Sequence, residues 1–501
     1  MGDVLVVGAG PVGLTAACQL ARLGVGVRVI DALPEPTTES RAVSIHARSM
    51  EMLAALGVVP RLESLGRRIA ALEIVDGPTG DTRARLDFGG IPSRYPYLLD
   101  IPQPDTEAVL AARATELGVV VEHGVSLTAL TQDDTGVDVT LATPAGEQTA
   151  RVGWVVGADG GHSTTRRLVG AHLEGAFHGE HFAMADVDVA TDLDRDTIRM
   201  FAHRDGIGLL FPLRGDRARI MFLVGTPEPG TAPSLAEVQA LADARMDGRV
   251  TVSNPRWLAY FEIHHAQVPQ YRHGRVLLAG DAAHIHSPAG AQGMNTGIQD
   301  AANLAWKLAL VAQGRADASL LDTYQDERHP VGATVVRGTT VLTEVGTATG
   351  AKAAVRDAAL FVVGHVPALG AAAATTAAEL RVHHRDSVLS VQHGHRHHGA
   401  RAGDHAPDPE GTAVPVEELL ARPGFLLLVR GAVDGLEAVL GDLGSVVSAD
   451  DAVAAAYGWG GDGMALVRPD GYLGLVADTV DADLLRRYLT ETLRVTAPAR
   501  V

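Results

Sequence analysis

The first forty residues constrain the fold more than any other part of the chain. Val4–Val7 is a short, continuous apolar run of the kind that forms a buried parallel strand. A glycine turn follows it, and the Ala- and Leu-rich segment Leu14–Leu23 predicts a helix closed by Gly24. Val25–Ile30 predicts a second strand, and Asp31 stands at its end. This order of strand, glycine turn, helix, strand and acid predicts a βαβ unit.

The glycines of the turn, Gly8, Gly10 and Gly13, have the spacing of the dinucleotide-binding fingerprint. The first allows a tight turn, the second lets a pyrophosphate approach the backbone, and the third lets the helix pack close to the strand. Val12 lies in the same turn, and Asp31 is placed to accept hydrogen bonds from a ribose. The competing interpretation is a plain tight turn in a βαβ unit. The pattern does not distinguish FAD from NAD.

The same glycine spacing recurs at Gly458–Gly463, which shows that the pattern alone is weak. That copy follows a helical stretch and precedes a strand, so the order is reversed and we expect a loop. The sequence therefore has no second credible fingerprint, and a separate pyridine-nucleotide domain is not expected.

Composition limits the class of protein. The 501 residues carry a formal charge of −18, from 42 Lys and Arg against 60 Asp and Glu. Such an acidic chain is a poor candidate for binding nucleic acid or anionic lipid. Cys18 is the only cysteine, which excludes an intrachain disulfide and a CxxC pair and fits a reducing compartment. The sequence shows no signal peptide and no uninterrupted apolar run of about 20 residues, so we expect a cytoplasmic protein without a membrane span.

The sequence pattern changes between about residues 182 and 265. Short apolar runs there alternate with turn-forming Arg-Asp-Gly and Arg-Gly-Asp clusters, which predicts antiparallel hairpins. The predicted strands are Ile198–Ala202, Gly208–Leu213 and Arg219–Val224. Outside this region, Trp154–Asp159 and Val276–Asp281 predict buried strands, and residues 293–313 and 317–345 predict helices.

The remaining third of the chain has a different organisation. Residues 351–381 are Ala-rich and predict helix, whereas residues 392–412 are polar and resemble a linker. Phe425–Val429 and Met464–Val467 predict strands of a small separate α/β unit.

Two later motifs carry a resemblance to a known family. Gly157–Arg167, which includes Asp159 and Gly160, resembles the DG motif of group A flavoprotein monooxygenases. Gly280–Leu308 resembles their GD motif and the flavin-contacting helix that follows it. The order and spacing are similar to those of the para-hydroxybenzoate hydroxylase fold over residues 1 to about 390. The chain resembles most closely the aromatic polyketide hydroxylases of actinomycete antibiotic pathways.

Those hydroxylases are similar to phenol hydroxylase in carrying a C-terminal thioredoxin-like domain. Gly403–Asp408 resembles the start of that domain and Arg468–Tyr472 resembles its late strand, and the missing CxxC fits the family. The resemblance implies an α/β fold in which a Rossmann-like FAD-binding domain carries an inserted antiparallel-sheet substrate domain. The implied FAD-binding domain comprises residues 1–75, 100–178 and 272–390, the substrate domain 76–99 and 179–271, and the thioredoxin-like domain 391–501.

The resemblance also implies which residues bind the cofactor. Arg41 would bind the FAD pyrophosphate, Gln103 would lie beside the ribityl chain, and Leu127 would contact adenine through its backbone. A carboxylate at Asp281, just after a buried strand, can hold a ribityl or ribose hydroxyl. The small, glycine-rich segment from Pro288 to Asn295 lets a flat ring lie on the backbone. The helix that starts near Gly293, followed by Met294, directs its positive end at that ring.

The implied activity is that of an FAD-dependent aromatic hydroxylase. NADPH would reduce the flavin after docking without a dedicated domain. Dioxygen would then form a C4a-hydroperoxyflavin, and an electron-rich phenolic carbon would attack its electrophilic outer oxygen. A planar polyketide would need apolar walls with few polar anchors. A homodimer is compatible with the sequence. The base that deprotonates the phenol stays open, with Tyr95, Tyr97, Arg214 and His264 as hypotheses.

Several other activities compete with hydroxylation. A Baeyer–Villiger oxygen insertion would use the peroxyflavin as a nucleophile, whereas a flavin-binding sensor would have no turnover and a dehydrogenase would incorporate no oxygen. A flavin-dependent halogenase is disfavoured because its WxWxI motif needs two tryptophans two residues apart, which this chain lacks.

Single residues also have alternative interpretations. Asp159 could cap a turn, and His284 and His286 have the wrong spacing for a metal pair. The histidines between His393 and His398 fit a solvated linker. Trp306, Leu308 and Cys18 fit core positions.

Overall fold

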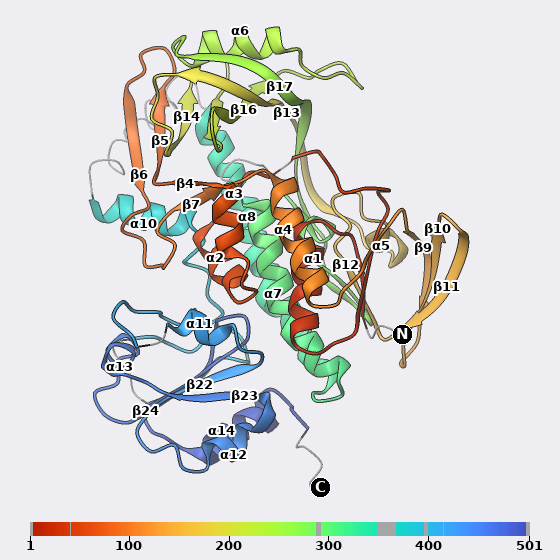
Figure 1. The fold of residues 1–501 in the computed structure, drawn as a ribbon, viewed down its shortest axis with the longest axis vertical. Coiled ribbons are helices and arrows are strands. Elements are labelled where there is room, and N and C mark those ends of the chain that lie inside the picture. Colours follow the sequence, from red (N-terminus) through yellow and green to blue (C-terminus); the bar gives the residue numbers. More distant parts are fainter. Residues whose placement is uncertain are drawn as a thin grey trace.

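The computed structural model describes residues 4–40, 42–286, 292–347, 367–394, 399–413 and 415–496. Figure 1 shows three regions along the long axis of the molecule: a large sheet at the top, a helical layer over a parallel sheet in the middle, and a small α/β unit at the bottom. None of the described helices is both long and apolar enough to cross a membrane.

The middle region is built on a six-stranded sheet in the order β18-β19-β12-β1-β2-β8, parallel except at β18. Its strands are β1 (Val4–Val7), β2 (Val27–Asp31), β8 (Val121–His123), β12 (Trp154–Gly157), β18 (Arg272–His273) and β19 (Val276–Leu278). Helix α1 (Pro11–Arg22) joins β1 to β2, which confirms the predicted βαβ unit. The helix begins at Pro11 instead of Leu14 because proline has a backbone angle suited to the first turn.

Helices cover this sheet and one another. Helix α1 packs against α4 (Gln103–Glu116) and α7 (Gly293–Ala312), and α7 in turn packs against α2 (Ala47–Ala54) and α8 (Asp322–Thr347). The shorter helices are α3 (Val59–Leu65), α5 (Thr164–Leu168) and α10 (Pro367–Ala377), with 3-10 turns at Gly280–Ala282 and Ala318–Leu321. Most of the predicted helix 351–381 lies outside the described residues.

A three-stranded antiparallel sheet flanks the parallel sheet (Figure 1). Its strands are β9 (Ser126–Gln132), β10 (Val137–Thr143) and β11 (Gly146–Val152). A second three-stranded sheet joins β3 (Ser44–Ile45), β7 (Leu98–Asp100) and β4 (Arg67–Ile69).

The top region is an eight-stranded sheet in the order β20-β17-β13-β16-β15-β14-β5-β6. The strands are β5 (Ala71–Asp76), β6 (Thr82–Asp87), β13 (Glu174–Thr191), β14 (Thr197–Ala202), β15 (Gly208–Pro212), β16 (Arg217–Val224), β17 (Val250–Gln267) and β20 (His284–Ile285). The predicted hairpin strands are present, but β5 pairs with β14 in parallel and places residues from 71 onward in this sheet. Helix α6 (Leu235–Arg245) covers one face, and Phe182, Phe211 and Met221 line an apolar core on the other.

The bottom region contains a five-stranded sheet in the order β21-β25-β24-β22-β23. Its elements are β21 (Val391–His393), α11 (Val416–Leu420), β22 (Phe425–Arg430), α12 (Leu436–Leu440), β23 (Gly444–Ser448), α13 (Asp451–Ala456), β24 (Gly463–Val467), β25 (Leu473–Ala477), α14 (Ala482–Arg487), a 3-10 turn at Gly441–Leu443 and a π turn at Tyr488–Thr492. The glycine copy before β24 forms a loop, as predicted. The polar stretch from residue 392 starts inside β21, so it is not wholly a linker.

Apolar and charged contacts join the bottom unit to the middle region. Trp306 and Leu310 of α7 share a core with Phe425 and Leu427 of β22. Beside this core, Arg468 donates to both oxygens of Glu327 on α8, at 2.7 and 2.9 Å. Further hydrogen bonds complete a buried network, which comprises Asn303, Trp306, Lys307, Glu327, Ser387, Arg468 and Asp470.

Candidate functional site

The glycine turn after β1 has two tight positions and one open position. Gly8 has a φ of +106°, and a Cβ there would lie 2.3 Å from the carbonyl oxygen of Ala158. A Cβ at Gly13 would lie 2.0 Å from the carbonyl oxygen of Gly8. At Gly10 the nearest atom to a Cβ would be Oε1 of Glu107, at 3.9 Å. The fold itself therefore requires Gly8 and Gly13, whereas Gly10 leaves the backbone open to a ligand.

Asp31 at the end of β2 holds this turn. Its Oδ2 accepts from the Ala9 N–H at 2.7 Å, and its Oδ1 accepts from the Leu33 N–H at 2.8 Å. Each carboxylate oxygen can accept a second hydrogen bond, so Asp31 keeps the capacity to bind a ribose hydroxyl.

Gln103 ties the start of α4 to the segment that follows β2. Its backbone N–H donates to Ser40 Oγ at 3.1 Å, and its Oε1 accepts from the Ala42 N–H at 3.1 Å. Arg41, between these two residues, lies outside the described residues. Gln103 therefore contacts both Ser40 and Ala42.

Glu107 belongs to this neighbourhood, although the sequence analysis did not select it. Its Oε1 accepts from Gln103 Nε2 at 2.8 Å, one helical turn away. Burial raises the pKa of Glu107 to about 7, and the charge of Asp31 contributes to the increase. The i, i+4 spacing from Gln103 was the only available signal in the sequence.

Asp159 holds the loop after β12 through hydrogen bonds to residues that follow it in the chain. Asp159 accepts from the Ser163 hydroxyl at 2.5 Å and from the Thr165 N–H at 2.9 Å, and Gly160 follows with a φ of +74°. These contacts match the alternative interpretation in which Asp159 caps a turn. Arg166 then donates to the carbonyl oxygens of Gly161 and Ala282 at 2.6 and 3.1 Å, so the DG and GD segments lie together.

Val12 joins the GD segment to the first turn of α1. A Cβ at Gly280 would lie 2.9 Å from a Val12 methyl carbon, and a Cβ at Gly297 would lie 2.5 Å from it. Asp281 follows as an exposed acid. These small residues bring the start of α7 close to the glycine turn.

The start of α7 is fixed by Asn295. Its side-chain oxygen accepts from the His46 N–H and its amide nitrogen donates to the Ser44 carbonyl oxygen, both at 2.8 Å. Met294 is buried in the main core, and Gly293 begins the helix. Pro288 lies outside the described residues.

Helix α7 is also held by three buried side chains, Asp300, His284 and Arg328. Asp300 Oδ2 lies 2.7 Å from His284 Nε2, and Asp300 Oδ1 accepts from Arg328 Nε at 2.8 Å. Burial alone would raise the pKa of Asp300, but the charges of Arg328 and His284 lower it below its usual value. This contact gives His284 a structural partner, and the described residues contain no group of three metal-ligating side chains.

Other predicted residues lie elsewhere. Leu127 is buried in β9 opposite Leu141, within the core of the small sheet. Tyr97 donates to Glu63 and Tyr95 donates to Glu417, and burial raises the pKa of both phenols. Neither tyrosine is therefore a good base.

The other two candidates for the base, Arg214 and His264, lie in different segments of the chain. Arg214 donates to the Ser64 carbonyl oxygen. His264 lies on β17 with its Nε2 3.9 Å from a carboxylate oxygen of Glu262.

A second carboxyl group missed by the sequence analysis lies on β7, between β3 and β4. Asp100 on β7 is fully buried and accepts from the Ser44 hydroxyl through Oδ1, whereas Oδ2 has no hydrogen-bond partner. Burial raises its pKa to about 8, against the opposing effects of Ser44, Arg219 and Arg67. No pattern in the sequence distinguishes Asp100 from other acids at strand ends.

Comparison with known proteins decides the family. The model of the FAD binding domain family matches residues 1–339. The chain belongs to this family. The FAD-binding chain is 34% identical to the 6-methylpretetramide 4-monooxygenase of Streptomyces rimosus, over 94% of this chain and 90% of that protein.

Solved structures agree over the full length. The FAD-binding chain superposes on anhydrotetracycline hydroxylase from Streptomyces rimosus with a TM-score of 0.81, at 31% identity, over 99% of this chain and 100% of that one. It superposes on aklavinone-11 hydroxylase, solved with FAD and aklavinone, with a TM-score of 0.79, at 27% identity, over 98% and 99% of the two chains. The predicted α/β fold of the FAD-dependent aromatic hydroxylases and the predicted FAD-dependent monooxygenase are thereby confirmed, whereas the thioredoxin-like nature of the C-terminal unit stays a prediction.

Proposed function

We propose that the FAD-binding chain hydroxylates a fused-ring phenol of the aromatic polyketide class with NADPH as electron donor, in the biosynthesis of an antibiotic. One observation carries the proposal: the glycine turn, the Gln103 neighbourhood, the DG loop and the start of α7, far apart in sequence, are joined by direct contacts. The full-length likeness to proteins named for 6-methylpretetramide and aklavinone supports the substrate class.

The residues present fit FAD. The open backbone at Gly10 suits the diphosphate, and the helix end at Gly293 suits negative charge near the ring. The proposed FAD-binding set is Gly8, Gly10, Val12, Gly13, Asp31, Arg41, Gln103, Leu127, Asp159, Gly160, Asp281, Pro288, Gly293, Met294 and Asn295. Within it, Gly8, Val12, Gly13, Asp159 and Asn295 act mainly by holding the backbone.

Bound FAD would supply the activation of dioxygen with electrons from NADPH. Dioxygen, the phenol, NADPH and one proton become the hydroxylated product, NADP⁺ and water. The chain positions the reactants and excludes water. We assign the substrate wall to the inner face of the eight-stranded sheet, where Trp257 and Phe261 of β17 pack against an apolar core.

The division into domains belongs to the same proposal. We propose that residues 76–99 and 179–271, extended by β5, form the substrate domain inserted into the FAD-binding domain. The five-stranded bottom unit fits a thioredoxin-like domain without a CxxC pair.

The test is isotope labelling with the FAD-loaded protein. It is given NADPH, ¹⁸O₂ and a panel of polyketide phenols, and the products are weighed and located by mass spectrometry and NMR. We expect one labelled oxygen on an aromatic carbon for each NADPH consumed. A labelled lactone would establish Baeyer–Villiger insertion, and substrate oxidation without label would establish a dehydrogenase. A protein that binds no FAD would end the proposal.

A further inference from the structure

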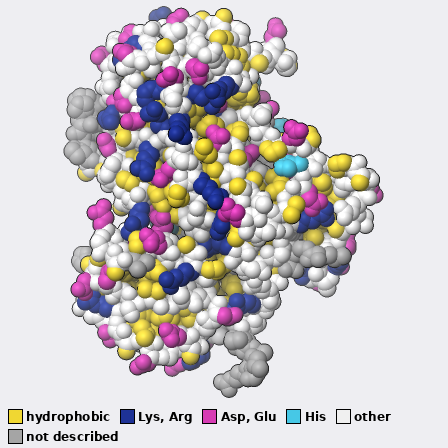
Figure 2. Space-filling model, in the orientation of Figure 1, with side chains coloured by type: hydrophobic (Ala, Val, Ile, Leu, Met, Phe, Trp, Pro, Cys, Tyr) yellow, Lys and Arg dark blue, Asp and Glu magenta, His cyan; other side chains and the backbone are white. Residues whose placement is uncertain are grey.

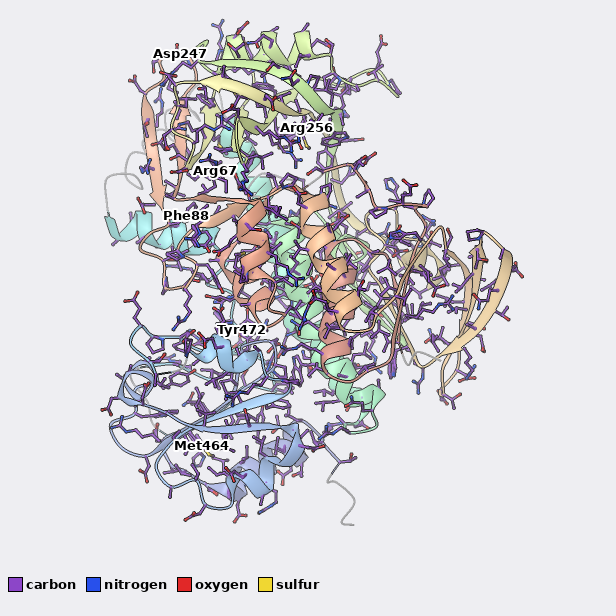
Figure 3. All side chains as sticks on the ribbon, in the orientation of Figure 1. Arg67, Phe88, Asp247, Arg256, Met464 and Tyr472 are labelled. Atoms are coloured by element: carbon purple, nitrogen blue, oxygen red, sulfur yellow. The ribbon has the colours of Figure 1, made fainter. Side chains whose placement is uncertain are left out.

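Four arginines gather where the eight-stranded sheet meets α3 and α4. Arg195 precedes β14, Arg214 and Arg217 flank the turn between β15 and β16, and Arg256 lies on β17. We refer to them as the arginine cluster. Figure 2 shows basic side chains on this face below the top sheet, and Figure 3 labels Arg256 and Arg67 in the region where the top sheet meets the helices.

Contacts within the protein hold the cluster together. Arg195 Nη2 donates to the carbonyl oxygens of Gly215 and Arg217, at 2.9 and 2.6 Å. Arg67 donates to the Leu213 carbonyl oxygen at 3.1 Å, at the start of the same turn. Strand pairing brings Arg256 to the same part of the sheet, because β13 lies between β16 and β17: its Asp188 is opposite Arg217, and its Asp186 is opposite Trp257, the residue after Arg256. Burial lowers the pKa of Arg217, and the charge of Arg256 lowers it further.

The cluster lacks the carboxylate partners that other arginines of this protein have. Within the described ranges, none of its four guanidinium groups has a carboxylate oxygen within 4.0 Å. Arg67 beside it is paired with Asp196, and Arg219 on the same strand as Arg217 is paired with Asp186. In a chain of net charge −18, unpaired positive charge concentrated at one place marks a site for an anion.

Acidic groups are near the cluster without contacting it. Asp105, Asp186 and Asp188 act on Arg217 electrostatically, and Asp216 acts on Arg195. Asp186 is already bound by Arg219 through two hydrogen bonds, of 2.7 and 2.9 Å. These acids moderate the local field without pairing with the cluster, in which Arg195 and Arg214 use part of their donors on backbone carbonyl oxygens.

The cluster borders the candidate flavin site. Arg67, which donates to the Leu213 carbonyl oxygen beside the cluster, lies on β4 opposite Asp100 of β7, and Asp100 is three residues before Gln103 in the chain. Gln103 contacts the Ser40–Ala42 segment and Glu107 beside the glycine turn. An anion held by the arginine cluster is therefore adjacent to the place assigned to FAD.

We propose that the arginine cluster binds the phosphate groups of NADPH, with the 2′-phosphate as the main recognised group. Planar guanidinium groups bind phosphate oxygens in pairs, and four of them match a ligand with several phosphates. The coenzyme then needs no dinucleotide-binding domain of its own. This inference rests on the proposed function, because it assumes that the reduced coenzyme is consumed.

The test measures binding without turnover. FAD-loaded protein is titrated calorimetrically with 2′,5′-ADP, with 5′-AMP and with inorganic phosphate, at low and physiological salt. The variant is Arg217→Gln with Arg256→Gln, and the control is Arg151→Gln, an exposed arginine of the small sheet paired with Asp133. We expect the double variant to bind 2′,5′-ADP at least tenfold more weakly, with the control unchanged. The conservative double variant, Arg217→Lys with Arg256→Lys, should keep part of the affinity because it keeps the charge.

Steady-state kinetics supply the second readout. We expect the glutamine double variant to raise the KM for NADPH about tenfold and the KM for NADH much less, with kcat and the flavin spectrum unchanged. Unaltered 2′,5′-ADP binding, an equal loss in the control, or equally tight binding of inorganic phosphate and 2′,5′-ADP would overturn the inference. If the wild-type protein oxidises no NADPH, the proposed function fails, while the calorimetry still decides whether the cluster binds the nucleotide.

Discussion

At the scale of single residues, the three glycines of the first turn have different roles. Gly8 and Gly13 are required because a side chain would collide with neighbouring backbone, whereas Gly10 has free space in front of it. Folding and cofactor binding can therefore be separated by substitution within one short turn.

Gly13→Ala should destabilise the protein by about 1–3 kcal/mol or more, because its Cβ would lie 2.0 Å from the Gly8 carbonyl oxygen. Gly10→Ala should fold normally, because Gly10 has an ordinary φ of −71°, but should lose bound FAD. Thermal unfolding and the flavin absorbance of the purified proteins check both. A Gly10→Ala protein with full flavin content would contradict the assignment of this turn to the diphosphate.

Asp100 predicts a pH dependence of stability. Its pKa is about 8 in the folded protein against an ordinary value of 3.8, so between these values the folded state binds more protons than the unfolded state. Stability from this group is present below pH 3.8 and is lost as the pH rises through 8. Relative to Asp100→Asn, the wild type should lose on the order of 2 kcal/mol or more between about pH 5 and pH 9. Urea unfolding of both proteins at several pH values measures the difference, and parallel curves would refute it.

At the scale of elements, the position of α7 depends on contacts with segments distant in the sequence. Asn295 binds the backbone of β3 and of the start of α2, 251 and 249 residues earlier in the chain. The arrangement links the start of α7 to the strand that carries Ser44.

Asn295→Ala should leave two buried backbone groups without partners, at a cost of about 1–3 kcal/mol each. FAD should dissociate faster, because the helix end shifts. Asn295→Asp is the matched control, since it keeps the acceptor for the His46 N–H and loses only the donor to Ser44. Thermal unfolding and fluorescence measurement of FAD release should rank Asp between Asn and Ala; an unaffected Ala variant would disprove the role.

The sequence predicted elements whose signals are local, and it missed sites whose partners are distant. Strand β1, the glycine turn and the hairpin strands follow from neighbouring residues, and the DG and GD motifs identified the family. The pairing of Asp300 with Arg328 and the buried Asp100 depend on tertiary packing. The sequence did not predict the arginine cluster either, because its members come from segments that are distant in the chain. Of the four, only Arg214 was a candidate from the sequence, as the base that deprotonates the substrate.

At the scale of the whole molecule, a buried charge network joins the bottom unit to the helices. Figure 3 shows Tyr472 at this junction, four residues after Arg468. Arg468 and Lys307 balance Glu327 and Asp470, and all four side chains are fully buried.

Arg468→Ala should destabilise the protein by about 3–5 kcal/mol, because it leaves buried carboxylates without their main partner. The control Arg430→Ala removes an exposed pair with Asp451 and should cost less than about 1 kcal/mol. Chemical unfolding followed by flavin release and tryptophan fluorescence measures both variants. Equal effects of the two substitutions would show that the network does not stabilise the junction.

The separation of this network along the chain has a consequence for synthesis. Glu327 and Arg468 are 141 residues apart in the chain. Helices α7 and α8 therefore leave the ribosome well before Arg468, whose guanidinium neutralises the Glu327 carboxylate. A nascent chain stopped before that point would leave Glu327 with Lys307 but without Arg468, and would expose the apolar side of Trp306, a kind of surface that favours aggregation. The junction between the helices and the bottom unit therefore forms only after the last part of the chain has been synthesised.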